Sequence, residues 1–115
     1  MEKLLSGSAG RRFVERVLTV GERNQLASLQ PRRALEYVSG RFAAKEAIVK
    51  ALGCGIGGIV SFQDIEVLPD PLGKPQCTLS PASVKRLGWT DQGYKLHVAI
   101  THERSLAAAT AIIEK

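Results

Sequence analysis

The stretch GRFAAKEAIVKALGCGIG, residues 40–57, decides how this chain folds. It begins as a charged, alanine-rich segment of helical composition and runs directly into a glycine-rich turn. Its charged side chains lie within ten residues of one another: Arg41, Lys45, Glu46 and Lys50. Carried on one helix, such a group can hold an anion and a divalent cation together.

A helical wheel puts the apolar residues around this stretch on one stripe. With Arg41 at zero and about 100° per residue, the stripe spans roughly 20° to 120°. It consists of Leu35, Val38, Phe42, Val49 and Leu52. Lys45 falls inside this arc and Glu46 lies just past its far edge. We expect these charges to need a partner, a metal or a ligand, because an unpaired buried charge is costly.

The spacing of Glu46 and Lys50 allows two interpretations. They are an i, i+4 pair in the favourable order, which is common on solvated helices. They also lie on the same side of the helix, where they could serve a functional site. Spacing alone leaves both interpretations open.

Turn and capping signals divide the rest of the chain. Thr19 and Glu22 form a capping-box pattern, and Ser80 before Pro81 is typical of a helix start. The expected helices cover about 11–18, 20–29, 34–52 and a short segment that ends at Gly88. The expected strands lie around 65–67, 76–79 and 96–101, while the alanines of 106–113 also suit a helix. Helices followed by hairpin-connected strands indicate an α+β fold.

Length and composition indicate one small cytoplasmic domain over residues 1–115. The chain has room for a single core and contains no run of 18 apolar residues, so we expect no membrane partner. The N-terminus lacks the apolar region of a secretory signal. Cys54 and Cys77 stand apart from any CxxC pattern, which favours free thiols.

Positive charge is concentrated in the first half. Residues 1–50 carry ten Lys and Arg against five Glu, whereas residues 51–115 carry six of each sign. This surplus of five steers an acidic partner toward the helical half. Nucleic acid is the generic candidate for a basic chain, but 5% aromatic residues offer no evident stacking platform. A nucleic-acid module stays open as the weaker interpretation, and we expect no nucleic-acid partner.

Several longer blocks resemble one known family, and they cover nearly the whole chain in order. The blocks are RFVERVLT at 12–19, GRFAAKEA at 40–47, KALGCGIG at 50–57, SFQDIEV at 61–67, GKP at 73–75 and HVAITH at 97–102. They are similar to the bacterial holo-[acyl-carrier-protein] synthases, which are small phosphopantetheinyl transferases. The resemblance implies helices packed on a small antiparallel sheet, with 106–113 as its final strand.

The resemblance also implies an activity. Enzymes of this family use magnesium to transfer 4'-phosphopantetheine from coenzyme A to a serine of apo-acyl carrier protein, which releases adenosine 3',5'-bisphosphate. The product carrier protein serves fatty acid biosynthesis. Active sites of the family lie between the subunits of a homotrimer.

The family's functional residues are carried over only where this sequence matches its motifs. Glu46 matches the helix-borne metal ligand, and Lys50 is expected to face the diphosphate, so these two are the catalytic candidates. The other expected contacts to coenzyme A are Arg41, Thr101, His102 and the backbone at Gly53, Gly55 and Gly57. Lys45 is expected to contact either the coenzyme A phosphates or the surroundings of the metal. The acidic helix of the carrier protein is expected to dock on Arg11, Arg12 and Arg16.

One departure concerns the metal. The family begins with an apolar strand that ends in Gly-x-Asp, and this aspartate is the second protein ligand. Here the earliest aspartate is Asp64, on an expected strand. We therefore expect the native start to lie upstream, and residues 1–115 to bind magnesium and coenzyme A weakly. The alternative is a non-catalytic domain that binds carrier protein or nucleotide.

Overall fold

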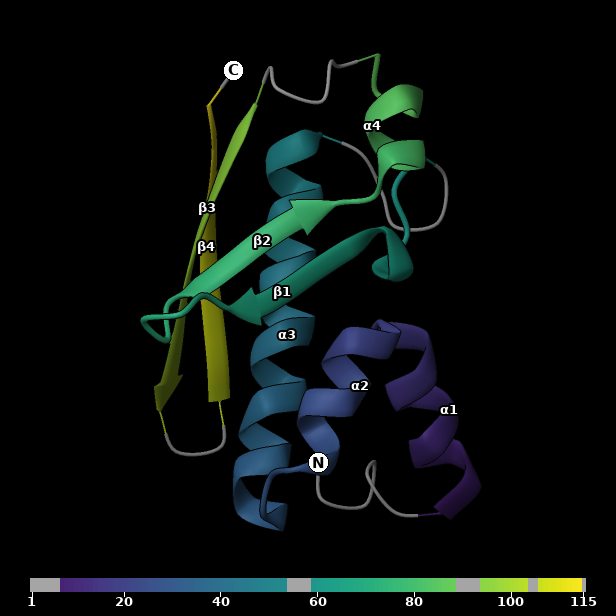
Figure 1. Ribbon diagram of the computed structural model, residues 1–115, viewed down its shortest axis with the longest axis vertical. Coiled ribbons are helices and arrows are strands. Elements are labelled where there is room, and N and C mark those ends of the chain that lie inside the picture. Colours follow the sequence, from purple (N-terminus) through teal and green to yellow (C-terminus); the bar gives the residue numbers. More distant parts are fainter. Residues whose placement is uncertain (1–6, 54–58, 89–93, 104–105, 115) are drawn as a thin grey trace.

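A 22-residue helix, α3 (Pro31–Leu52), is the axis around which the other elements are arranged (Figure 1). The computed structural model describes residues 7–53, 59–88, 94–103 and 106–114. The remaining elements are α1 (Gly7–Val17), α2 (Val20–Ala27), the 3-10 turn η2 (Phe62–Asp64), β1 (Ile65–Pro69), β2 (Pro75–Leu79), α4 (Pro81–Arg86), β3 (Lys95–Glu103) and β4 (Leu106–Glu114). Three helices precede two antiparallel hairpins, with α4 between the hairpins, so the predicted α+β class is confirmed.

Capping chemistry sets the helix boundaries. Both bonds of the capping box between Thr19 and Glu22 are present at the start of α2. α3 begins at Pro31, three residues earlier than predicted, because proline suits the first helical turn, where its missing N–H is not needed. Gly53 ends α3 with φ of 76°, a left-handed conformation that glycine adopts readily. Ser80 caps α4 as expected.

The strands form two antiparallel hairpins. β1 pairs with β2 from Ile65↔Leu79 to Pro69↔Pro75, and β3 pairs with β4 from Lys95↔Glu114 to Glu103↔Leu106. The second hairpin settles the ambiguous segment 106–113 as a strand. Pairing with β3 outweighs the weak helix preference of its alanines. In Figure 1 the β1–β2 hairpin crosses α3, with β3 and β4 along one side of that helix.

Two apolar clusters share α3. One contains Ala44, Ile48, Val49, Val60, Ile65, Val67, Leu79 and Val84, and the other contains Val17, Leu18, Tyr37, Val38 and Phe62. From the predicted stripe, Val38 and Val49 are buried, while Phe42 and Leu52 are partly buried against these clusters. α3 therefore packs against apolar residues on two sides.

Cys77 lies on β2, packed against the first cluster, and is a free cysteine. Burial raises the pKa of its thiol to about 12. Cys54 lies outside the described residues. Within the described ranges, no helix combines the length and apolar character needed to cross a membrane.

Candidate active site

The charges of α3 divide into a buried face and a more exposed face. Lys45 is completely buried, and its Nζ donates to Glu22 Oε1 at 2.6 Å, Val17 O at 2.6 Å and Phe62 O at 3.0 Å. An ammonium group has three N–H donors, and all three are used here. Burial lowers the pKa of Lys45, while the adjacent Glu22 carboxylate opposes the shift.

This placement corrects the role expected for Lys45. The wheel correctly put it inside the apolar arc, but its partner is a carboxylate of the same chain. A buried ammonium with three protein acceptors has no donor left for a coenzyme A phosphate. Lys45 is therefore a structural residue next to the site, and we remove it from the ligand contacts.

The Glu22 carboxylate connects three elements. Besides Lys45, Oε1 accepts a hydrogen bond from the Thr19 N–H at 2.8 Å, and Oε2 accepts one from the Val67 N–H at 2.7 Å. The Val67 carbonyl accepts a bond from Arg41 Nε at 3.1 Å. Both polar backbone groups of this β1 residue are thus bound by side chains from α2 and α3.

Arg41 is half-buried and already oriented. Its guanidinium carbon lies 4.1 Å from the centre of the Tyr37 ring, a cation–π contact. Burial raises the pKa of Tyr37 to about 12, although the Arg41 charge acts in the opposite direction. Stacking and the bond to Val67 restrict the planar guanidinium, which favours bidentate binding of an anion such as phosphate.

Glu46 and Lys50 occupy the last two turns of α3. Glu46 is half-buried and Lys50 is exposed. In the described part of the chain Glu46 accepts no hydrogen bond and forms no ion pair, including with Lys50. The surface ion-pair interpretation of this spacing is therefore not what the structure shows. A half-buried carboxylate without a partner suits a cation.

The described residues offer the smallest set of protein ligands with which magnesium is commonly bound, a single carboxylate. Across the described ranges, no group of three or more His, Cys, Asp or Glu side chains comes together. Magnesium sites commonly use one or two carboxylates together with substrate phosphates and water. Glu46 can supply one carboxylate, and Lys50 lies one turn away as a point charge for a phosphate.

The remaining expected ligand contacts are placed only in part. Gly53 follows α3 directly, and a Cβ at this position would meet no atom within 4 Å. Gly55 and Gly57 lie outside the described residues. Thr101 and His102 are in β3 opposite Ala108 and Ala107, and their side chains are outside what the structure describes.

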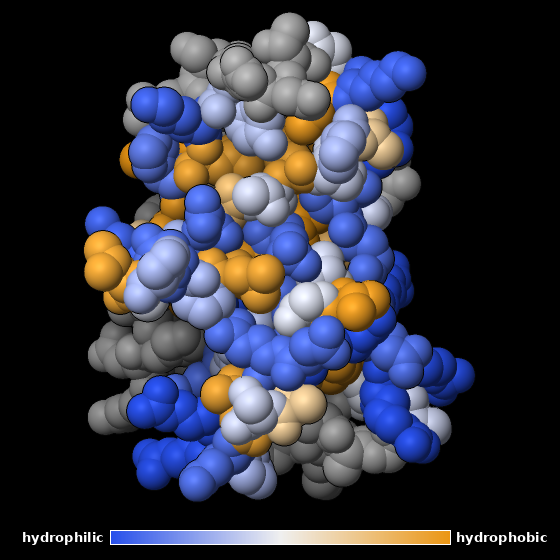
Figure 2. All heavy atoms as spheres, viewed as in Figure 1, coloured by the Kyte–Doolittle hydropathy of each residue, from blue (hydrophilic) through white to orange (hydrophobic). Residues whose placement is uncertain are grey.

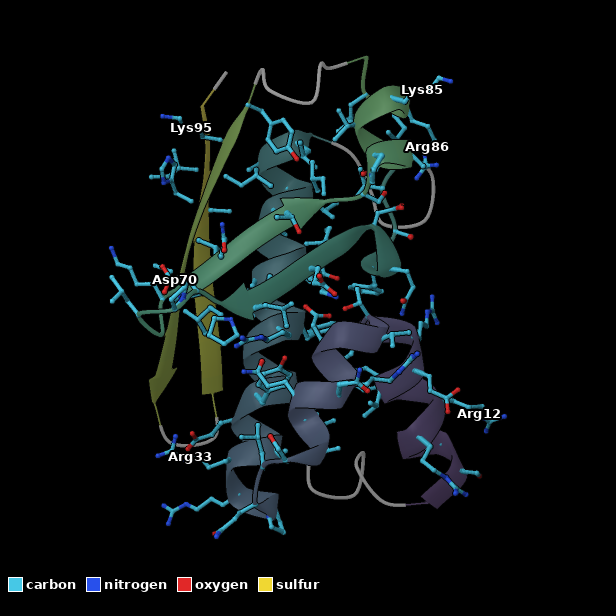
Figure 3. The ribbon with its side chains drawn as sticks, viewed as in Figure 1. Arg12, Arg33, Asp70, Lys85, Arg86 and Lys95 are labelled. Carbon is cyan, nitrogen blue, oxygen red and sulfur yellow. The ribbon has the colours of Figure 1, made fainter. Side chains whose placement is uncertain are left out.

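The carrier-docking candidates lie on α1. Arg11, Arg12 and Arg16 are all exposed, and Arg12 points away from the helix (Figure 3). Hydrophilic side chains cover much of this end of the molecule (Figure 2). Beside them is a groove of about 370 Å³, lined by Arg11, Val14, Glu15, Arg23, Leu26, Ala27 and Ala34. A basic surface beside an apolar groove suits an acidic, amphipathic helix.

Sequence reasoning missed two carboxylates. Glu22 was predicted only as a helix cap, yet the lysine inside the apolar arc was a signal that a buried acid must exist. Asp64 accepts hydrogen bonds from Ser61 N, Ser61 Oγ, Ser80 Oγ and Arg86 Nη2 at 2.7–3.0 Å. Its oxygens are occupied by the chain, so Asp64 is no substitute for the aspartate that the family places before this region.

Comparisons with known proteins agree with one another. The model of the 4'-phosphopantetheinyl transferase superfamily matches residues 2–111. A holo-[acyl-carrier-protein] synthase of Bacillus subtilis is 47% identical over 118 residues, covering 98% of this chain and 88% of that protein. One of Geobacillus kaustophilus is 46% identical over 105 residues, covering 91% of this chain and 74% of that protein.

Solved structures show the same relationship. The holo-(acyl-carrier-protein) synthase of Bacillus anthracis, solved in complex with CoA (3',5'-ADP), has a TM-score of 0.75 at 42% identity, covering 90% of this chain and 80% of that one. The synthase of Neisseria meningitidis has a TM-score of 0.78 at 37% identity, covering 92% and 82%.

Proposed function

Because the chain belongs to the 4'-phosphopantetheinyl transferase superfamily, we propose that it transfers 4'-phosphopantetheine from coenzyme A to a serine of apo-acyl carrier protein. The match over residues 2–111 confirms the resemblance and the enzyme class that the sequence predicted. The substrates are those named for its relatives. We place the activity in the cytoplasm and in fatty acid biosynthesis.

The Glu46 carboxylate, which has no partner among the residues that the structure describes, is the observation that carries this proposal. It is half-buried near the end of α3, one turn before the exposed Lys50 and close to the helix end at Gly53. A helix that needed Glu46 only for solubility or stability would pair it or expose it fully. Holding a cation against a diphosphate explains both its burial and its lack of a partner.

The reaction places few covalent demands on the protein. The serine oxygen forms a new bond to the phosphorus next to pantetheine, the bond from phosphorus to the adenosine bisphosphate oxygen breaks, and the hydroxyl proton is released. Magnesium, when bound, neutralises charge on the diphosphate. Lys50 and Arg41 stabilise the phosphate oxygens, Lys50 as a point charge and Arg41 through its planar fork.

Carrier protein and subunit contacts belong to the same proposal. The exposed arginines of α1 attract the acidic carrier before it docks. The homotrimer is proposed from the family resemblance, and the β3–β4 hairpin supports a contact with another subunit, because Ala99 and Ile112 are exposed on it and Ile112 is 62% exposed. An apolar side chain this exposed on a strand is suited to contact with another subunit.

A mass measurement tests the proposal. Apo-acyl carrier protein is incubated with this chain, coenzyme A and magnesium, and the expected result is a gain of one phosphopantetheinyl group. We expect slow transfer by residues 1–115, because Glu46 supplies a single carboxylate for magnesium. Carrier binding without any gain in mass contradicts the proposal and favours a non-catalytic binding domain.

A further inference from the structure

We infer that Glu22 is a positioning residue: by pairing with Lys45 it fixes the rotation of α3 against β1 and so holds Arg41 and Glu46 toward the substrate. This inference rests on the function proposed above. It assigns the buried ion pair a role in the geometry of the site, although neither of its members touches a ligand.

The contacts of Glu22 connect the start of α2 to both α3 and β1. One carboxylate bonds to Thr19 on the way into α2, to Lys45 on α3 and to Val67 on β1. The last two contacts span 23 and 45 residues of sequence. A change in the position of α3 relative to β1 has to break at least one of these bonds.

Val67 provides the fixed end of the link. Its N–H is held by Glu22 and its carbonyl by Arg41, while its side chain is fully buried in the core. Lys45 lies four residues after Arg41 and therefore on the same face of α3. The helix is attached to one residue of β1, Val67, at two successive turns, directly by Arg41 and through Glu22 by Lys45.

Glu46 follows Lys45 immediately, so the angular position of the Lys45 side chain around the axis of α3 also sets that of Glu46. Side chains extend about 6 Å from a helix axis, and a rotation of about 20° therefore moves a side-chain end by about 2 Å. A displacement of about 1 Å at a reacting group can cost about 100-fold in rate. If Lys45 no longer fixes the rotation of α3, we therefore expect the Glu46 carboxylate to move far enough to cause a large loss in transfer rate.

Stability alone does not require this pair. Apolar residues of similar volume often replace a buried ion pair without loss, whereas removal of one partner is strongly destabilising. The chain nevertheless keeps two charges at 0% exposure, with every hydrogen-bond donor of the ammonium satisfied. The directional hydrogen bonds of the Glu22–Lys45 pair fix the rotation of α3 about its axis more closely than apolar packing at the same positions would.

The test compares Glu22→Gln and the double variant Glu22→Gln/Lys45→Met with Leu79→Ala. Leu79 is buried on β2 and bonds to none of the site residues, so it controls for a general loss of core stability. Backbone-amide NMR spectra are recorded without ligand and during titration with coenzyme A and magnesium, at a temperature where each variant is folded. Transfer rates are measured in parallel.

We expect both Glu22 variants to shift the amides of residues 41–50 without ligand, to weaken coenzyme A binding at least tenfold and to slow transfer about 100-fold. Leu79→Ala should stay within twofold of the unmodified chain. The double variant leaves no unpaired buried charge. It therefore tests the positioning role of Glu22 even if Glu22→Gln alone does not fold.

Unchanged amide shifts over 41–50, or equal losses in the double variant and Leu79→Ala, overturn the inference. If the unmodified chain binds coenzyme A but transfers nothing, the proposed function fails while the shifts and affinities still decide the role of Glu22. An unmodified chain that binds no coenzyme A at all contradicts both.

Discussion

Lys45 Nζ lies 2.6 Å from Glu22 Oε1, and neither side chain is exposed. The pair connects the first turn of α2 to the middle of α3 in the interior of the protein. Its members lie beside the candidate site, and the residue that faces outward, Glu46, is the next one along the chain. Of these two adjacent residues of α3, Lys45 therefore stabilises the fold and Glu46 is available to the candidate site.

The Glu22–Lys45 pair should show strong energetic coupling. Glu22→Gln or Lys45→Met alone is expected to lower the free energy of unfolding by about 3–5 kcal/mol, because each leaves a buried charge unpaired. The double variant should lose far less than the sum of the two. Urea unfolding of all four proteins measures the coupling. Additive losses would show that the two charges do not depend on each other.

Glu46→Gln should separate activity from stability. The amide keeps the size of the side chain but removes the charge that attracts a cation. We expect transfer to fall by at least 100-fold, while the free energy of unfolding changes by about 0.5 kcal/mol or less, since Glu46 has no partner to lose within the described ranges. Steady-state kinetics and urea unfolding check the two values. A loss of stability that matches the loss of activity contradicts a metal-binding role.

Arg12→Glu should weaken the encounter with carrier protein only. Reversing an exposed charge on α1 is expected to raise KM for the carrier roughly tenfold at low salt and to leave KM for coenzyme A unchanged. Lys85→Glu changes net charge equally but lies on α4, at the far end from Arg12 (Figure 3). An equal effect of the two substitutions would mean that net charge, and not the α1 surface, attracts the carrier.

Asp64 should govern stability in acid. Burial alone raises its pKa, but the hydrogen bonds from Ser61 and Ser80 and the charge of Arg86 outweigh burial and hold the pKa below its ordinary value. The stabilisation is therefore complete above the unfolded pKa, about 4, and is lost as the pH falls through the lower folded value.

Asp64→Asn tests this pH dependence. We expect it to cost about 1–3 kcal/mol at pH 7, and the difference from the unmodified chain should shrink as the pH falls below about 4. Thermal unfolding between pH 7 and pH 2 measures it. A difference that is constant across this range would show that the charge of Asp64 contributes nothing.

Local signals were sufficient for most of the fold. The capping box at Thr19, the left-handed stop at Gly53 and the serine–proline start of α4 are short-range features, and all are present. Segment 106–113 was ambiguous because its outcome depends on pairing with β3, a contact that periodicity does not encode. The start of α3 was placed too late because proline was taken to separate helices when it begins one.

The candidate site was less predictable. The wheel placed Lys45 on the buried face but gave no means to tell a protein partner from a ligand, since Glu22 lies 23 residues away in sequence. The spacing of Glu46 and Lys50 allows both an ion pair and a site, and only three-dimensional placement shows that they do not pair with each other. Long-range partners decide the role of a buried charge, and sequence spacing does not contain them.

The position of a cation relative to Glu46 is the most direct test of the proposed function. Crystals grown with coenzyme A and Mn²⁺, a stand-in for Mg²⁺ with an anomalous signal, locate that cation. We expect the peak at about 2.0–2.2 Å from a Glu46 carboxylate oxygen, and in contact with a diphosphate oxygen of coenzyme A. A diphosphate bound elsewhere, with Glu46 paired to a side chain of the protein and no cation beside it, contradicts the proposal.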